Sequence, residues 1–245
     1  MRLLRPMLYG LALMVNLALP QVVWAADLVV IAADNAGAQL HPGKTIKAGS
    51  SITLAAGGRI TVLAQSGKVI KLKGPYNGPV QGTKGATGPS RLAAVSKLLG
   101  TGRRSTTLGA TRSSGSANSR TRAAPANVWV VESDRAGQAC VQPNNMMLWR
   151  PAASAPATIA LWPLDGTPKK IDWAAGKSTQ RISDPALSDG VQLSVLAGGR
   201  NTAIVLSVLP KDIDPAPSGR LLQWMAARGC RGQVKKLVRL LHNDG

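Results

Sequence analysis

The first 25 residues carry the pattern of a cleavable secretory signal. Arg2 and Arg5 precede an apolar run from residue 7 to residue 19, and Pro20 ends that run. Small side chains then stand before Ala26, so we expect cleavage between Ala25 and Ala26. The run has 13 residues, whereas a membrane-spanning helix needs about 20. The sequence therefore predicts an exported chain, with no transmembrane helix in its mature part.

Export bears on the two cysteines, Cys140 and Cys230. In an oxidising compartment an even pair predicts one disulfide, which would close a 90-residue loop. In the chain-entropy model such a loop is worth roughly 4–5 kcal/mol. The alternative is two free thiols that act as catalyst or metal ligands. It is the weaker interpretation, because neither cysteine lies in a C-x-x-C pair and His41 and His242 are the only histidines.

Residues 26–80 predict a small antiparallel β-domain. Short segments of alternating apolar and polar residues are separated by the turn pairs Gly57-Gly58 and Ser66-Gly67. The expected strands cover residues 28–31, 51–55, 59–63 and 68–73. Since one face is apolar and the other carries Thr, Lys and Arg, we expect one buried and one solvent-exposed face.

Residues 81–127 differ in composition, because Gly, Ser, Thr, Arg and Ala dominate. They predict a flexible basic linker interrupted by one short helix over residues 91–99. The whole chain has a net charge of +19, and residues 84–122 contain eight Lys or Arg and no acid. Such a charge predicts an anionic partner. The candidate residues for binding it are Arg103, Arg104, Arg112, Arg120 and Arg122.

The remainder of the chain predicts a β-sandwich-like domain at 128–210 and a helical pair at 211–245. Short apolar segments follow one another at spacings of about ten residues, with turn residues between them. Four tryptophans are expected in the sandwich core: Trp129, Trp149, Trp162 and Trp173. Helices are expected over residues 219–228 and 232–241, with Cys230 between them. The predicted fold is thus mainly β, with two β-domains and a C-terminal helical pair.

The motifs that could carry catalysis are incomplete. Gly-Lys-Thr at 43–45 and Gly-Lys-Ser at 176–178 lack the earlier glycine of a phosphate-binding loop, so both are interpreted as turns. Glu132 and Asp134 form the one close acid pair on an expected strand, where they would share a face, and a surface ion-pair role is favoured over catalysis. The last helix carries a basic face that we interpret as solvated rather than membrane-bound: Arg231, Lys235, Lys236 and Arg239. We predict no catalytic, metal or cofactor site.

Residues 43–78 resemble the periplasmic FecR-type domain. The resemblance rests on Gly43, on residues 46–49 and 52–63, and on residues 66–72 with Gly74-Pro75 after them. The order of this segment, a basic linker, a Trp-containing β-domain and a helical end with Arg-Gly-Cys at 228–230 also resembles a group of exported Gram-negative proteins. These likenesses imply a periplasmic, non-enzymatic module of the cell envelope.

Two functional hypotheses follow. The first is a periplasmic binding or scaffold protein that engages an envelope protein or an anionic glycan or lipid surface. The second is an envelope hydrolase or glycan-modifying enzyme with an unrecognised site. Nucleic acid is not expected as a partner, because the chain is exported and has no Phe and only two Tyr to stack on bases.

Overall fold

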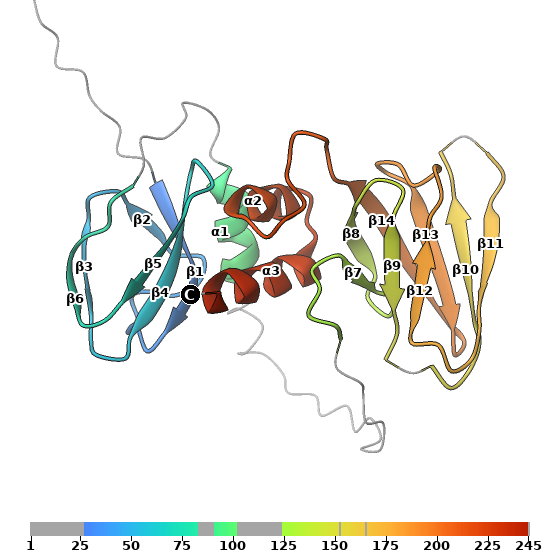
Figure 1. Ribbon diagram of the computed structural model, residues 1–245, viewed down its shortest axis with the longest axis horizontal. Helices are drawn as coiled ribbons and strands as arrows, with labels where there is room; N and C mark the ends of the chain where they lie inside the picture. The colour runs from blue at the N-terminus through green and yellow to red at the C-terminus, as the bar shows by residue number, and fades with distance from the viewer. Residues whose placement is uncertain (1–26, 83–90, 102–123, 152, 165, 245) are drawn as a thin grey trace, which may run out of the picture.

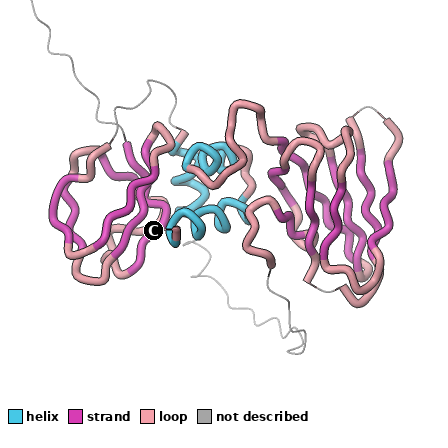
Figure 2. Tube along the Cα trace, viewed as in Figure 1, coloured by secondary structure: helices cyan, strands magenta, loops and turns pink. Residues whose placement is uncertain are grey.

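The computed structural model describes residues 27–82, 91–101, 124–151, 153–164 and 166–244. The predicted signal segment and most of the basic linker lie outside these residues. The chain is mainly β, and two β regions stand on either side of a layer of three helices (Figures 1 and 2). Among the described residues, no helix has both the length and the apolarity needed to cross a bilayer.

The first β region contains strands β1 to β6. A four-stranded antiparallel sheet has the order β2-β1-β4-β5, and β3 pairs with β6 in a second, two-stranded sheet. Leu28, Val30, Leu54, Ile60 and Val62 belong to one buried cluster that holds the region together. The strands are β1 (Asp27–Asp34), β2 (Thr45–Lys47), β3 (Ser51–Leu54), β4 (Arg59–Ala64), β5 (Val69–Lys73) and β6 (Tyr76–Pro79).

The central strands β1 and β4 are buried on both faces, so the expected solvent-exposed face is wrong for them. Val29, Ile31 and Leu63 point away from the core of the first β region and pack against the helices. Thr61, on the face expected to be polar and wet, is only 1% exposed. The alternating pattern is present, but alternation within a strand does not reveal that a distant segment will cover its second face.

The second β region is built from two sheets around one core. A five-stranded sheet has the order β11-β10-β13-β14-β8, and a three-stranded sheet has the order β12-β9-β7. Two of the pairings, β8 with β14 and β7 with β9, are parallel. Leu148, Ile159, Trp173, Leu193 and Ile204 lie in the shared core. The strands are β7 (Val130–Glu132), β8 (Gly137–Val141), β9 (Met146–Trp149), β10 (Ala157–Trp162), β11 (Lys169–Trp173), β12 (Thr179–Ile182), β13 (Gln192–Ala197) and β14 (Arg200–Val208).

Three of the four tryptophans expected in this core lie elsewhere, and Trp173 is the one that belongs to it. Trp149 is buried but lines the cleft beside α3 instead. Trp162 is 50% exposed at the end of β10, because the neighbouring Leu161 takes the inward position. Trp129 precedes β7 and packs against the helices instead, and its indole N–H donates to the Pro215 carbonyl at 3.2 Å. The presence of a tryptophan in a predicted strand is therefore not enough to place it in the core of the second β region.

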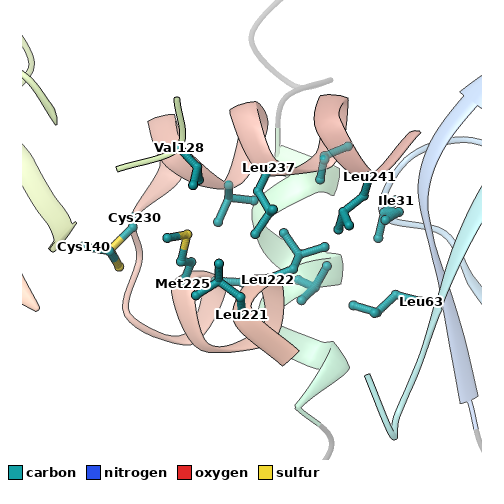
Figure 3. Packing of buried hydrophobic residues seen from close by; sticks show 14 of the residues in the cluster. Ile31, Leu63, Val128, Cys140, Leu221, Leu222, Met225, Cys230, Leu237 and Leu241 are labelled. Atoms are coloured by element: carbon teal, nitrogen blue, oxygen red, sulfur yellow. A yellow bond between two sulfur atoms is a disulfide. The ribbon is translucent and has the colours of Figure 1, made fainter. Parts of the chain in front are cut away.

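The helical layer contains α1 (Leu92–Gly100), α2 (Gly219–Ala227) and α3 (Arg231–Asn243), as the sequence predicted within one or two residues at each end. Ser218 caps α2 by accepting a hydrogen bond from the Leu221 amide. One buried cluster joins residues of all three helices to Ile31 and Leu63 of the first β region and to Val128 beside the second (Figure 3). The helices thus form a third buried cluster, between the cores of the two β regions, that takes in a few residues of each.

The predicted disulfide is confirmed. Cys140, in β8, is bonded to Cys230, which lies between α2 and α3, and the Cα atoms are 5.8 Å apart (Figure 3). Both cysteines are fully buried. The bond therefore ties the helical pair to the second β region, as expected.

Two buried glutamines add hydrogen bonds at the two sides of the helical layer. Gln233 of α3 accepts from the Cys140 amide at 2.7 Å and donates to the carbonyls of Val128 and Cys140 at 3.0 and 2.6 Å. Gln223 of α2 donates to the carbonyls of Ala64 and Gln65 at 3.0 and 3.2 Å. Each amide satisfies backbone groups at a junction where buried polar groups would otherwise lack partners.

Candidate functional site

The arginines predicted to bind an anionic partner lie outside the described residues. Arg103, Arg104, Arg112, Arg120 and Arg122 all fall between Thr101, which follows α1, and Ala124. The described residues at the far end of this segment, 124–126, line a cleft of about 580 Å³ beside α3. The structure therefore places the residues that flank the basic segment, Thr101 and Ala124, but not the arginines within it.

This cleft and a second one of about 680 Å³ share three charged residues: Glu132, Arg135 and Lys236. We refer to these three as the Glu132 cluster. Lys236 Nζ lies 3.1 Å from Glu132 Oε1 and donates to the Val130 carbonyl at 3.2 Å. Arg135 forms an ion pair with the other carboxylate oxygen, Oε2. Both oxygens of Glu132 are therefore engaged by cations.

The cluster corrects the interpretation of the last helix. Arg231, Lys235 and Arg239 are exposed as expected, but Lys236 is only 5% exposed and faces β7. A lysine is almost never fully buried unless it is paired, and its partner here comes from a strand remote in sequence. Nothing in the spacing along α3 identified that partner.

Glu132 and Asp134 do not share a strand face. Strand β7 ends at Glu132, and Asp134 lies exposed on the turn that follows. Glu132 forms ion pairs as expected, but the one with Lys236, which links β7 to α3, is largely buried rather than at the surface. A carboxylate that already accepts from two cations is not a free general base.

A second polar cluster, which the sequence analysis missed, joins the end of α3 to the first β region. His242 Nδ1 lies 2.7 Å from Thr61 Oγ1, and His242 Nε2 lies 2.8 Å from Asp34 Oδ2. Arg59 Nη2 lies 3.2 Å from the same Asp34 oxygen. The hydrogen bond with His242, together with the charges of His242 and Arg59, lowers the pKa of Asp34 below its ordinary value.

This hydroxyl, imidazole and carboxylate have the order of a catalytic triad, but the hydroxyl is inaccessible. Thr61 is 1% exposed within β4, so a substrate carbonyl has no route to its oxygen. A nucleophile must reach its substrate as well as its base. We therefore assign the cluster a structural role, holding the C-terminal turn of α3 against β1 and β4.

Arg150 forms a third polar centre, inside the second β region. Its guanidinium is buried and, among the described residues, has no carboxylate partner; it donates to the carbonyls of Lys177, Ala155 and Ala174 at 3.0, 2.8 and 2.7 Å. It also lies 4.6 Å from the centre of the Trp173 ring. Burial lowers the pKa of the guanidinium. These contacts hold the loops that carry the three carbonyls.

The glycines of the two rejected phosphate-loop motifs lie in turns. Gly43 and Gly176 have φ of +87° and +82°, values that favour glycine.

Within the described ranges, no three His, Cys, Asp or Glu side chains are grouped so that they could hold a metal ion. Three large apolar side chains are exposed on the second β region: Trp162, Leu164 and Leu196.

Comparison with known proteins gives no match: no protein-family model, no curated protein and no solved structure matches this chain.

Proposed function

We propose that this protein is a non-enzymatic binding or scaffold protein of the periplasm, and that its basic linker engages an anionic partner, either an acidic envelope protein or an anionic polymer. The observation that carries the proposal is the imbalance of charge. The chain has 30 Lys and Arg residues but only 11 Asp and Glu residues. Most of its basic side chains therefore have no acidic side chain in the same protein to balance their charge.

The contacts of the described acids strengthen this point. Asp34, Glu132, Asp184 and Asp189 each lie in an ion pair with a basic side chain. These acids are already engaged, so they do little to neutralise cations elsewhere. The surplus positive charge is the feature that an anionic surface or polymer would recognise.

The disulfide supports the proposed location, because such bonds persist in oxidising compartments outside the cytoplasm. Within the proposal, residues 43–78 serve as a FecR-type module. Of the two hairpin turns expected for that module, Ser66-Gly67 joins the paired strands β4 and β5. Gly57-Gly58 instead connects β3 and β4, which lie in different sheets, so it is not a hairpin turn. Terminal sequencing of protein recovered from the periplasm should give Ala26 as the first residue. An intact Met1 on a cytoplasmic product would contradict the location.

The binding role is tested by retention of the mature chain on beads coated with polyaspartate. Exposed charges are screened beyond about 8 Å at physiological salt, so retention should fall steeply as salt rises. A variant with the five linker arginines changed to Gln should elute at clearly lower salt than the parent chain. A matched control changes five exposed cations outside the linker to Gln: Lys71, Lys73, Lys170, Lys177 and Arg200.

The comparison of these two variants decides the matter. Both lose five positive charges, so a larger loss for the linker variant identifies the linker as the binding element. An equal loss of retention in both variants would mean that binding depends on net charge alone, and the linker would no longer be the proposed binding element. Turnover of peptidoglycan or another envelope polymer by the purified chain would overturn the non-enzymatic assignment in favour of the hydrolase alternative.

A further inference from the structure

A groove of about 440 Å³ runs along α1 and α2 where the loop after β14 crosses them. Its apolar lining comes from Ala94 of α1, Ile213 of the loop, and Trp224 and Ala227 of α2. Its volume falls in the range of small-molecule binding sites, which are mostly apolar with a few polar groups.

The charged residues of the groove favour an anionic ligand. Arg91 and Arg220 line it together with one acid, Asp212. All three side chains are exposed, and none forms an ion pair with any residue in the part of the chain that the structure describes. Two unpaired guanidinium groups against a single carboxylate leave a net positive site, and Arg is the residue best suited to bind a carboxylate.

The indole of Trp224 provides an independent observation. Its Nε1 atom is buried, and no acceptor for its N–H is found among the described residues. Buried N–H groups in proteins almost always have a partner, and an unsatisfied one needs an explanation. Because Trp224 lines the groove, a ligand oxygen becomes the missing acceptor once a rotation of the indole brings the N–H to the groove surface.

We propose that this groove binds an aliphatic monocarboxylate of medium chain length. The carboxylate lies beside Arg91 and Arg220, and the alkyl chain covers Ala94, Ile213 and the indole of Trp224. The site is separate from the linker arginines, so the proposal does not depend on the binding role proposed above.

Calorimetric titration of the mature chain with decanoate tests the proposal, with decanol as the uncharged probe. Decanoate should bind at least tenfold more tightly than decanol. Ala94→Trp should weaken decanoate binding at least tenfold by filling the groove, and the double change Arg91→Gln with Arg220→Gln should do the same by removing its charge. Lys97→Gln removes an exposed cation of α1 outside the groove and should leave binding unchanged. Circular dichroism of each variant establishes that it is folded.

Nuclear magnetic resonance of the indole groups places the bound ligand without any substitution. The indole N–H signal of Trp224 should shift on addition of decanoate. That of Trp173 should not, because Trp173 lies in the second β region, although its N–H also has no acceptor among the described residues. Equal affinity for decanol, equal shifts of both indoles, or decanoate binding that survives Ala94→Trp would each overturn the proposal. So would binding of an acidic peptide at this groove in the absence of any decanoate binding.

Discussion

Replacing Gln233 with Leu tests whether hydrogen bonds fasten α3 to the second β region in addition to the disulfide. The Gln233 side chain is 5% exposed and makes three hydrogen bonds, with the Cys140 amide and with the carbonyls of Val128 and Cys140. Leucine is apolar and similar in size, so it occupies the space but forms none of these bonds. The change therefore removes the hydrogen bonds while largely keeping the packing.

The expected loss follows from the number of bonds. A typical intramolecular hydrogen bond contributes about 1 kcal/mol net, so three of them predict a loss of about 3 kcal/mol in the free energy of unfolding. For a chain of this size, each kcal/mol shifts the melting temperature by about 2–4 °C, so the transition should fall by about 6–12 °C. The disulfide does not compensate, because it constrains the unfolded chain and does not supply partners to the freed backbone groups.

The assay combines thermal unfolding of the oxidised protein with hydrogen exchange of single amides. In Gln233→Leu, exchange at the Cys140 amide should accelerate more than exchange in β1 or β4. The matched control is Gln223→Leu in α2, which removes the two bonds to Ala64 and Gln65 on the opposite side of the helical layer. It should instead accelerate exchange near the end of β4. A Gln233→Leu protein that melts within 1 °C of the parent would refute the reasoning.

Three further predictions concern the bridge, acid stability and the linker. Changing both Cys140 and Cys230 to Ser should cost roughly 4–5 kcal/mol of unfolding free energy, and thiol counting on the denatured, unreduced parent protein should find none free. Because the fold lowers the pKa of Asp34, the ionised carboxylate is favoured in the native state. Its stabilisation should be complete above the unfolded pKa of about 4 and be lost as pH falls through the native pKa. Asp34→Asn should therefore reduce the difference in melting temperature between pH 7 and pH 3, and an unchanged difference would contradict this role. Limited trypsin digestion should cut first within residues 101–125, and protection of that segment in the free protein would show the predicted linker to be wrong.

Periodicity and turn residues were sufficient to predict most of the elements. The strands expected over residues 51–55 and 59–63 and all three helices are present, because each has a regular apolar spacing bounded by Gly, Pro or Ser. The missed strands were β2, β6 and β8. Strand β2 is only three residues long, β6 reads Tyr-Asn-Gly-Pro, and β8 begins with Gly137-Gln138, so none presents a clear alternating pattern.

The polar clusters could not be predicted, because each depends on residues far apart in the chain. His242 meets Asp34 and Thr61 across almost the full length of the described chain, and Lys236 meets Glu132 across the junction of α3 and β7. Sequence spacing reports only neighbours on one element, such as i and i+4 on a helix. The pairing of Cys140 with Cys230 was predictable for a different reason: with two cysteines only one pairing exists.

The arrangement of the helical layer bears on how the linker could act. The last described residue before the linker arginines, Thr101, follows α1, and its hydroxyl donates to the Leu98 carbonyl at 3.0 Å. The first described residues after them, 124–126, line the cleft beside α3. Both ends of the segment therefore lie at the helical layer, whose buried cluster also contains residues of both β regions. If the linker arginines bind an anionic partner, as proposed above, that partner is tethered to this layer at both ends of the segment. The second β region exposes Trp162 and Leu196, so it offers an apolar surface of a different chemical kind from the basic linker.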